Sequence, residues 1–82
     1  MIKRSVQING HPTSLSLEAA FWDELRRQAD MRGQSLAGLI AEIDASRMEA
    51  GQIEHGLSRA VRLWVFHQVQ AERDVLKPQT GR

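Results

Sequence analysis

Residues 3–17 alternate between apolar and polar side chains, which is the period of a β-strand that buries one of its faces. Asn9-Gly10 interrupts the alternation, and this pair tolerates the positive φ angles of a tight hairpin turn. The pattern therefore predicts two antiparallel strands, over residues 3–8 and 13–17, that form a β-hairpin.

The length of the hairpin loop decides which residues face each other across it. A two-residue loop places Val6 opposite Thr13 and Ser5 opposite Ser14. Because Pro12 has no N–H to donate to a strand ladder, a longer loop that includes Pro12 is the alternative. With the short loop, one face carries Val6, Ile8, Thr13, Leu15 and Leu17, and the other carries Lys3, Ser5, Gln7, Ser14 and Ser16.

From Glu18 onward the apolar residues recur with the period of an amphipathic helix, and the pattern predicts two helices, over residues 18–32 and 35–49. Gly33 is expected to end the first helix at its C′ position, and Ser35 is the natural N-cap of the second. The apolar stripes that these helices would bury are Phe21, Trp22, Leu25 and Ala29 in the first, and Leu36, Leu39, Ile40 and Ile43 in the second.

A third helix is expected over residues 57–73, after a linker over 51–56 that is bounded by two glycines. The segment Arg62–Phe66 has a high β propensity, so a strand is the competing interpretation, but the absence of a helix breaker favours a helix. Residues 75–82 show no period and are expected to form a flexible tail. The chain is therefore predicted to be one domain over residues 1–74.

A chain of 82 residues buries a thin core, and a strand followed by two helices cannot cover its own apolar faces. We therefore expect it to associate with a second copy of itself. The absence of cysteine suits a reducing compartment, and the longest apolar run, Leu63–Phe66, is far too short to span a membrane. Lys3 and Arg4 precede alternating rather than continuous apolar residues, unlike a signal peptide. The expected location is the cytoplasm.

The net charge of +1 is unevenly distributed along the chain. Residues 1–16 carry Lys3 and Arg4 without an acid, residues 17–50 carry seven acids against four arginines, and residues 51–82 carry five basic residues against three acids. A positive N-terminal arm on a nearly neutral body is compatible with DNA binding, although a strongly basic domain would argue for it more strongly.

The stretch RSVQINGHPTSLSLEAAFW, followed by LRRQAD, RGQSLAGLIAEID and LSRAVRLWV, resembles the ribbon-helix-helix family, and in particular small bacterial members with an extra N-terminal strand. The resemblance covers residue 4 to about residue 70. It implies an α+β, mostly α fold: an N-terminal β-hairpin, a helix pair and an additional C-terminal helix, assembled as an intertwined homodimer. It also implies a transcriptional regulator that inserts a β-ribbon into the major groove of double-stranded DNA.

The resemblance assigns roles to positions of this chain. Ser14 and Ser16 face bases from the ribbon, and Gly33 and the start of the second helix meet phosphate through free N–H groups. Serines are short and bond several bases alike, so Gln7, Lys3 and Arg4 on the extra strand must supply reach and charge. The implied phosphate contacts are Lys3, Arg4, Gln34, Ser35 and Leu36, and the implied dimer core is Leu15, Leu17, Phe21, Trp22, Leu25, Leu36, Ile40 and Ile43. If the four charges of two chains all contact phosphates, a plot of the logarithm of the DNA-binding constant against the logarithm of the salt concentration should have a slope of about −4.

The second function class is a homodimeric protein-interaction or assembly module that has lost base reading, including an antitoxin-like role in which the third helix holds a protein partner. Arg59, Arg62 and Arg73 form a basic stripe on that helix, which reads either as a solvated face or as a surface for a partner. Trp22 and Trp64 have core spacing. The histidines His11, His55 and His67 lack metal-ligand spacing, and no catalytic constellation is apparent. We expect no metal, no cofactor and no enzymatic activity.

Overall fold

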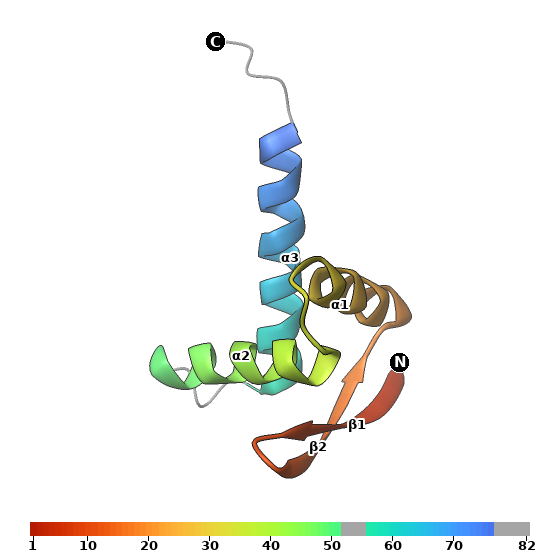
Figure 1. Cartoon of the computed structure of the whole chain (residues 1–82), viewed down its shortest axis with the longest axis vertical. Coiled ribbons are helices and arrows are strands. Elements are labelled where there is room, and N and C mark those ends of the chain that lie inside the picture. Colours follow the sequence, from red (N-terminus) through yellow and green to blue (C-terminus); the bar gives the residue numbers. More distant parts are fainter. Residues whose placement is uncertain (52–55, 77–82) are drawn as a thin grey trace.

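The computed structural model describes residues 1–51 and 56–76. These residues form an antiparallel two-stranded sheet followed by three helices, so the expected α+β, mostly α fold with an additional C-terminal helix is confirmed, and the homodimer stays a prediction. Figure 1 shows the hairpin below α2, with α3 rising past α1 and extending beyond the rest of the described chain. The elements are β1 (Ile2–Ile8), β2 (His11–Leu17), α1 (Ala19–Met31), α2 (Leu36–Glu49) and α3 (Leu57–Leu76).

The hairpin has a two-residue loop. Asn9 and Gly10 both adopt positive φ, 53° and 80°, as in the mirror-image turns that match the twist of paired strands. Val6 consequently pairs with Thr13, as predicted from the short loop. Pro12 lies within β2 rather than in the loop, so the longer-loop alternative is wrong.

The turn between α1 and α2 is held by backbone hydrogen bonds at both helix ends. Gly33 has a φ of 66°, and the N–H of Gln34 donates to the carbonyl of Ala29 at 2.9 Å, which closes α1 in a Schellman arrangement. Ser35 then caps α2, because its Oγ accepts the N–H of Gly38 at 3.0 Å. Both predicted helix boundaries, Gly33 and Ser35, are therefore confirmed.

One chain forms a buried core of its own, although the expectation was that a strand and two helices need a second copy to cover their apolar faces. That expectation considered a strand and two helices, whereas the structure adds β1 on one side and α3 on the other. The inner face of α3 contributes Val61 and Val65, which are almost completely buried. The buried apolar residues are Val6, Ile8, Leu15, Leu17, Trp22, Leu25, Ala29, Leu39, Ile40, Ile43, Val61 and Val65.

The third helix differs in detail from the expectation. The segment Arg62–Phe66 is helical rather than extended, and α3 continues to Leu76, past the expected end at residue 73 and into the predicted tail. The remainder of that tail, residues 77–82, lies outside the described part of the chain. Val69 is 43% exposed at the groove between α3 and α1, although the next turn of α3 still contacts α1 through Glu72.

Candidate nucleic-acid interface

The outward face of the hairpin gathers the residues that were predicted to read DNA bases. The pairs Gln7–Pro12, Ser5–Ser14 and Lys3–Ser16 alternate with the pairs that carry the buried Val6 and Leu15, so their side chains point away from the core. Ser14 and Gln7 are exposed, and Ser16 is half-buried. The face therefore offers hydroxyls, one amide and one ammonium group, all of which can bond to base edges or phosphates.

Arg4 lies on the opposite face from Lys3, since successive residues of a strand alternate between faces. Its guanidinium stacks over the ring of Trp22 at 5.5 Å from the centroid. Trp22 is itself anchored, because its indole N–H donates to the carbonyl of Ile2 at 2.9 Å. The two residues predicted to contact phosphate from the extra strand thus point in different directions.

The outer edge of β2 has unpaired backbone groups. Pro12 has no N–H, so its pair with Gln7 belongs to the set that exchanges no ladder hydrogen bonds, and this set alternates with the bonded pairs. By the same alternation, the N–H and carbonyl groups of Ser14 and Ser16 point outward from the hairpin. The carbonyl of Ser16 accepts the hydroxyl of Ser58, in the first turn of α3, at 3.3 Å. Ser14 therefore provides the central open pair of backbone groups on this edge.

At the start of α2, the other predicted phosphate contact, some of the polar groups already bond to other residues. The backbone N–H of Gln34 is bonded to α1, and its side-chain amide donates to the carboxylate of Glu42. The N–H groups of Leu36 and Ala37 precede the first hydrogen bonds of the helix and point along its axis. An anion could bind these two groups, but the Glu42 carboxylate nearby opposes a phosphate.

A groove joins the hairpin to the start of α2. It has a volume of about 540 Å³, and the residues that line it come from β1, α1 and the first turn of α2. Among the predicted contacts, Gln7 and Leu36 therefore line the same groove, whereas Ser14 and Ser16 of β2 do not line it. The lining residues are Arg4, Ser5, Val6, Gln7, Trp22, Leu36 and Ala37.

A polar cluster that sequence reasoning missed connects α1 to α3. Gln28 is 1% exposed, and its side-chain amide donates to Glu24 at 2.9 Å and to Glu72 at 2.7 Å. Arg27 bridges the same two carboxylates at 2.6 and 2.7 Å. The Arg27 guanidinium lowers the pKa of both Glu24 and Glu72, and the Gln28 amide acts in the same direction. The available signal was the position of Gln28 between the apolar Leu25 and Ala29.

This cluster is expected to make the docking of α3 dependent on pH. The ordinary pKa of Glu72 is 4.5 and its folded-state pKa is lower, so the contact stabilises the fold above that value and is lost as the pH falls through the folded pKa. We expect Glu72→Gln to reduce the fall in Tm between pH 6 and about pH 3, measured by circular dichroism. The matched control is Asp23→Asn, which removes an exposed carboxylate from α1. If both variants reduce the fall in Tm equally, the ion pair between Arg27 and Glu72 does not hold α3 against α1.

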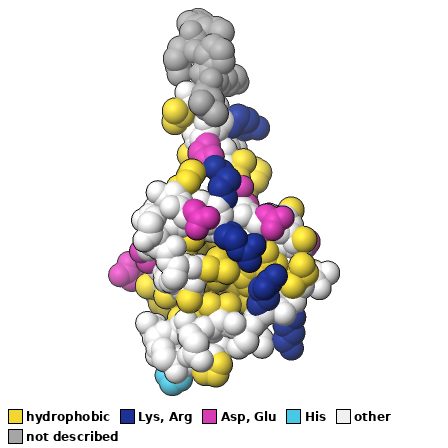
Figure 2. Space-filling model, turned by 45° about the vertical axis from the view of Figure 1, so that its right-hand side comes forward, with side chains coloured by type: hydrophobic (Ala, Val, Ile, Leu, Met, Phe, Trp, Pro, Cys, Tyr) yellow, Lys and Arg dark blue, Asp and Glu magenta, His cyan; other side chains and the backbone are white. Residues whose placement is uncertain are grey.

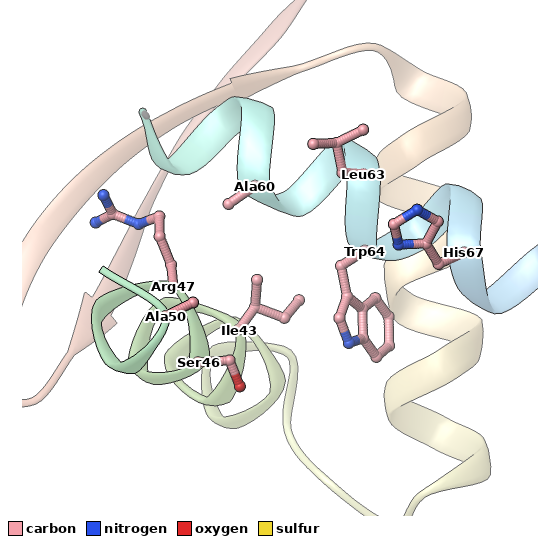
Figure 3. Close-up of a pocket in the computed structure, with 8 residues that line it drawn as sticks. All are labelled: Ile43, Ser46, Arg47, Ala50, Ala60, Leu63, Trp64 and His67. Atoms are coloured by element: carbon pink, nitrogen blue, oxygen red, sulfur yellow. The ribbon is translucent and has the colours of Figure 1, made fainter. Parts of the chain in front are cut away.

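A second hollow lies between α2 and α3 and has a volume of about 310 Å³ (Figure 3). Arg47 at its edge pairs with Asp44 at 2.6 Å, and the guanidinium of Arg32 lies 4.9 Å from the ring centroid of Trp64, which is half-buried. Its lining is Ile43, Ser46, Arg47, Ala50, Ala60, Leu63, Trp64 and His67. We assign it no ligand.

The described residues include no group of three side chains suited to hold a metal ion. His55, one of the three histidines of the chain, lies outside them. No helix in the described ranges is long and apolar enough to cross a membrane.

Comparison with protein families identifies this architecture. The family model described as a ribbon-helix-helix domain matches residues 1–69, which is most of the chain. Proteins of that family typically form dimers, generally bind DNA as transcription regulators and are not catalytic. Comparisons with curated proteins and with solved structures return no significant match. The match to the family model, together with the hairpin and helix order described above, shows that the chain belongs to the ribbon-helix-helix family.

Proposed function

We propose that this protein is a dimeric, sequence-specific DNA-binding regulator that inserts its β2 strands into the major groove. The observation that carries the proposal is the outward polar face of the hairpin, where Ser14, Ser16 and Gln7 lie together, and of these Gln7 also lines the groove at the start of α2. Hydroxyl and amide groups on a strand can bond to base edges, and a helix start can bond to a flanking phosphate. Both kinds of contact could then form on one side of the domain.

The open edge of β2 supports a dimer with a specific register. If two copies pair antiparallel about Ser14, its N–H and carbonyl bond to Ser14 of the second copy, and Pro12 pairs with Ser16. Pro12 cannot donate to the Ser16 carbonyl, and the Ser58 hydroxyl already donates to that oxygen. The register therefore leaves no strand acceptor unsatisfied at this pair.

The outer face of α2 is a further surface that a dimer could bury. Ala37, Ala41, Ala45 and Met48 recur on the side of the helix away from the buried Leu39, and Met48 is 50% exposed. Glu42, Ser46 and Glu49 form the polar side of α2, whereas Ala45 and Met48 are exposed in one chain. Small side chains there allow a second helix to approach closely.

The expected sheet is slightly wider than the groove that receives it. Four strands about 4.8 Å apart place the two β1 strands roughly 14 Å from each other, whereas the major groove is about 12 Å wide. The two β2 strands would therefore enter the groove, and the β1 strands would lie along its rims. In this position Lys3 reaches phosphates, and Gln7 reaches base edges from the rim.

The test is binding of the protein to a fluorescent duplex of its own upstream DNA, compared with a scrambled duplex, at two salt concentrations. We expect a preference for the upstream duplex that survives the higher salt. Because Arg4 stacks on Trp22, phosphate contacts of Lys3 from two copies predict a salt slope of about −2 rather than the −4 expected from both residues. Equal binding of both duplexes that disappears with salt would contradict sequence reading.

A homodimeric assembly module without base reading is the second candidate, and two observations favour it. The outward hairpin face holds two short serines, and the Glu42 carboxylate lies near the start of α2. Ser14→Arg distinguishes the two functions, because arginine bonds strongly to guanine edges. In a DNA-binding ribbon this substitution would change the affinity for DNA or the sequence preference, whereas in an assembly module it would change neither.

A further inference from the structure

The outer face of α3 carries a strip of exposed apolar and basic residues, which we call the α3 strip. At 3.6 residues per turn its members lie within a sector of about 80° of the helix circumference. Phe66 is 57% exposed and Val69 is 43% exposed, although both are large apolar side chains. The α3 strip consists of Arg59, Arg62, Phe66, Val69 and Arg73.

The apolar part of the α3 strip borders a groove between α3 and α1 with a volume of about 270 Å³. The groove is lined by Phe21 from α1 and by Val65, Phe66 and Val69 from α3. Glu24 is its one charged lining residue. Figure 2, in which the side carrying α1 is turned forward, shows hydrophobic side chains gathered over the middle of the body and bordered by charged ones. A groove of this kind accepts the apolar side chains of an amphipathic helix.

Among the described residues around the groove, the acidic side chains have ion-pair partners and some of the basic ones do not. Glu18 pairs with Arg62 at 3.0 Å, and Arg27 bridges Glu24 and Glu72, so the acids of this face already have basic partners. Within the ranges that the structure describes, Arg59 and Arg73 have no ion-pair partner. The two ends of the α3 strip therefore carry uncompensated positive charge on either side of exposed apolar residues.

We infer that the α3 strip and its groove bind an acidic amphipathic helix of a partner protein, with apolar side chains against Phe66 and Val69 and carboxylates against Arg59 and Arg73. A second copy of α3 fits less well, since antiparallel packing about Phe66 and Val69 brings Arg62 of one chain against Arg73 of the other. DNA on the hairpin would not reach the whole strip. Arg73 lies roughly 21 Å along α3 from Arg59, on the part that extends away from the hairpin.

The test uses a fluorescein-labelled synthetic helical peptide with leucines at i, i+3, i+4 and i+7 and glutamates on both flanks of the leucine stripe. The control peptide has lysine in place of each glutamate. Anisotropy titrations with the full chain should show tighter binding of the acidic peptide by on the order of tenfold or more, because complementary charges border the groove. Equal binding of the two peptides, or no binding of either, would overturn the proposal.

Variants of the protein locate the binding surface. The double variant Arg59→Glu and Arg73→Glu, and separately Phe66→Ser, should weaken binding of the acidic peptide by on the order of tenfold each. The matched controls are Arg26→Glu, on the opposite side of α1 from the groove, and Leu63→Ser, on α3 but outside the strip, and both should bind the peptide normally. All five substitutions are at exposed positions, and circular dichroism checks that each variant is folded.

The same variants separate this inference from the proposed DNA binding. The double arginine variant should retain the affinity of the parent for the upstream duplex, and Ser14→Arg should retain the affinity for the peptide. If the arginine variant instead loses DNA binding while peptide binding is unchanged, the α3 strip is a DNA surface and the inference is wrong. It is also wrong if Phe66→Ser abolishes self-association, measured by sedimentation, without changing peptide binding.

Discussion

Replacement of Val61 by aspartate is expected to unfold the whole domain at room temperature. Val61 is completely buried where α3 meets the hairpin and α2, so the substitution places a carboxylate in an apolar site without a partner. Such a group costs several kcal/mol, whereas a domain of 82 residues has a stability of roughly 4–12 kcal/mol. The measurement is the helical circular dichroism signal at 25 °C and its transition in urea.

The control is Leu63→Asp, on the same helix but 45% exposed. Its effect should be about 0.5 kcal/mol or less, as is usual at exposed positions. A Val61→Asp protein that loses the helicity of α3 alone and keeps a cooperative transition would contradict the prediction. That result would mean that the hairpin, α1 and α2 form an independent core, covered by a second copy rather than by α3.

Local features of the fold could be predicted because a few residues determine them. Asn9-Gly10 favours a turn with two positive φ angles, and this turn sets the register of every pair in the hairpin. Gly33 and Ser35 close one helix and open the next through hydrogen bonds with groups a few residues away. Such interactions are visible in the sequence, since both partners lie within one turn.

The remaining features depend on contacts between distant segments, which a residue pattern does not record. The bonds of Gln28 and Arg27 to Glu72 cross from α1 to α3, and the covering of the core by Val61 and Val65 depends on how α3 folds back. Arg4 was grouped with Lys3 as a phosphate contact on charge alone. Its stacking on Trp22 requires knowing which helix lies over β1.

For the candidate site, the alternation of the strands was sufficient to place Ser14, Ser16 and Gln7 on one face, because alternation is a property of the backbone. It was not predictable in the same way which polar groups at the start of α2 already have bonding partners. The use of the Gln34 N–H by α1 and the position of the Glu42 carboxylate follow from the geometry of the turn. The base-facing part of the site was thus easier to predict than the phosphate-facing part.

Ser14→Glu is expected to weaken binding to the upstream duplex by on the order of a hundredfold. Ser14 is exposed at the centre of the outward face, so two copies would bring two carboxylates between the phosphate walls of the groove and lose two hydroxyl contacts. The added repulsion acts on any duplex and supplies most of the expected effect, because a serine hydroxyl does not form a bidentate contact with a base. Binding to the scrambled duplex should therefore weaken as well, by a smaller factor.

The control for this variant is Ser46→Glu, which adds the same charge at an exposed serine of α2 beside the α2–α3 hollow. It should change DNA affinity little, since it lies on a different element from the hairpin face. Sedimentation must also show that Ser14→Glu assembles like the parent, because Ser14 is central to the proposed strand pairing. If the two glutamate variants weaken binding equally, the effect is one of net charge. Ser14 would then not contact DNA, and the hairpin would be an assembly surface.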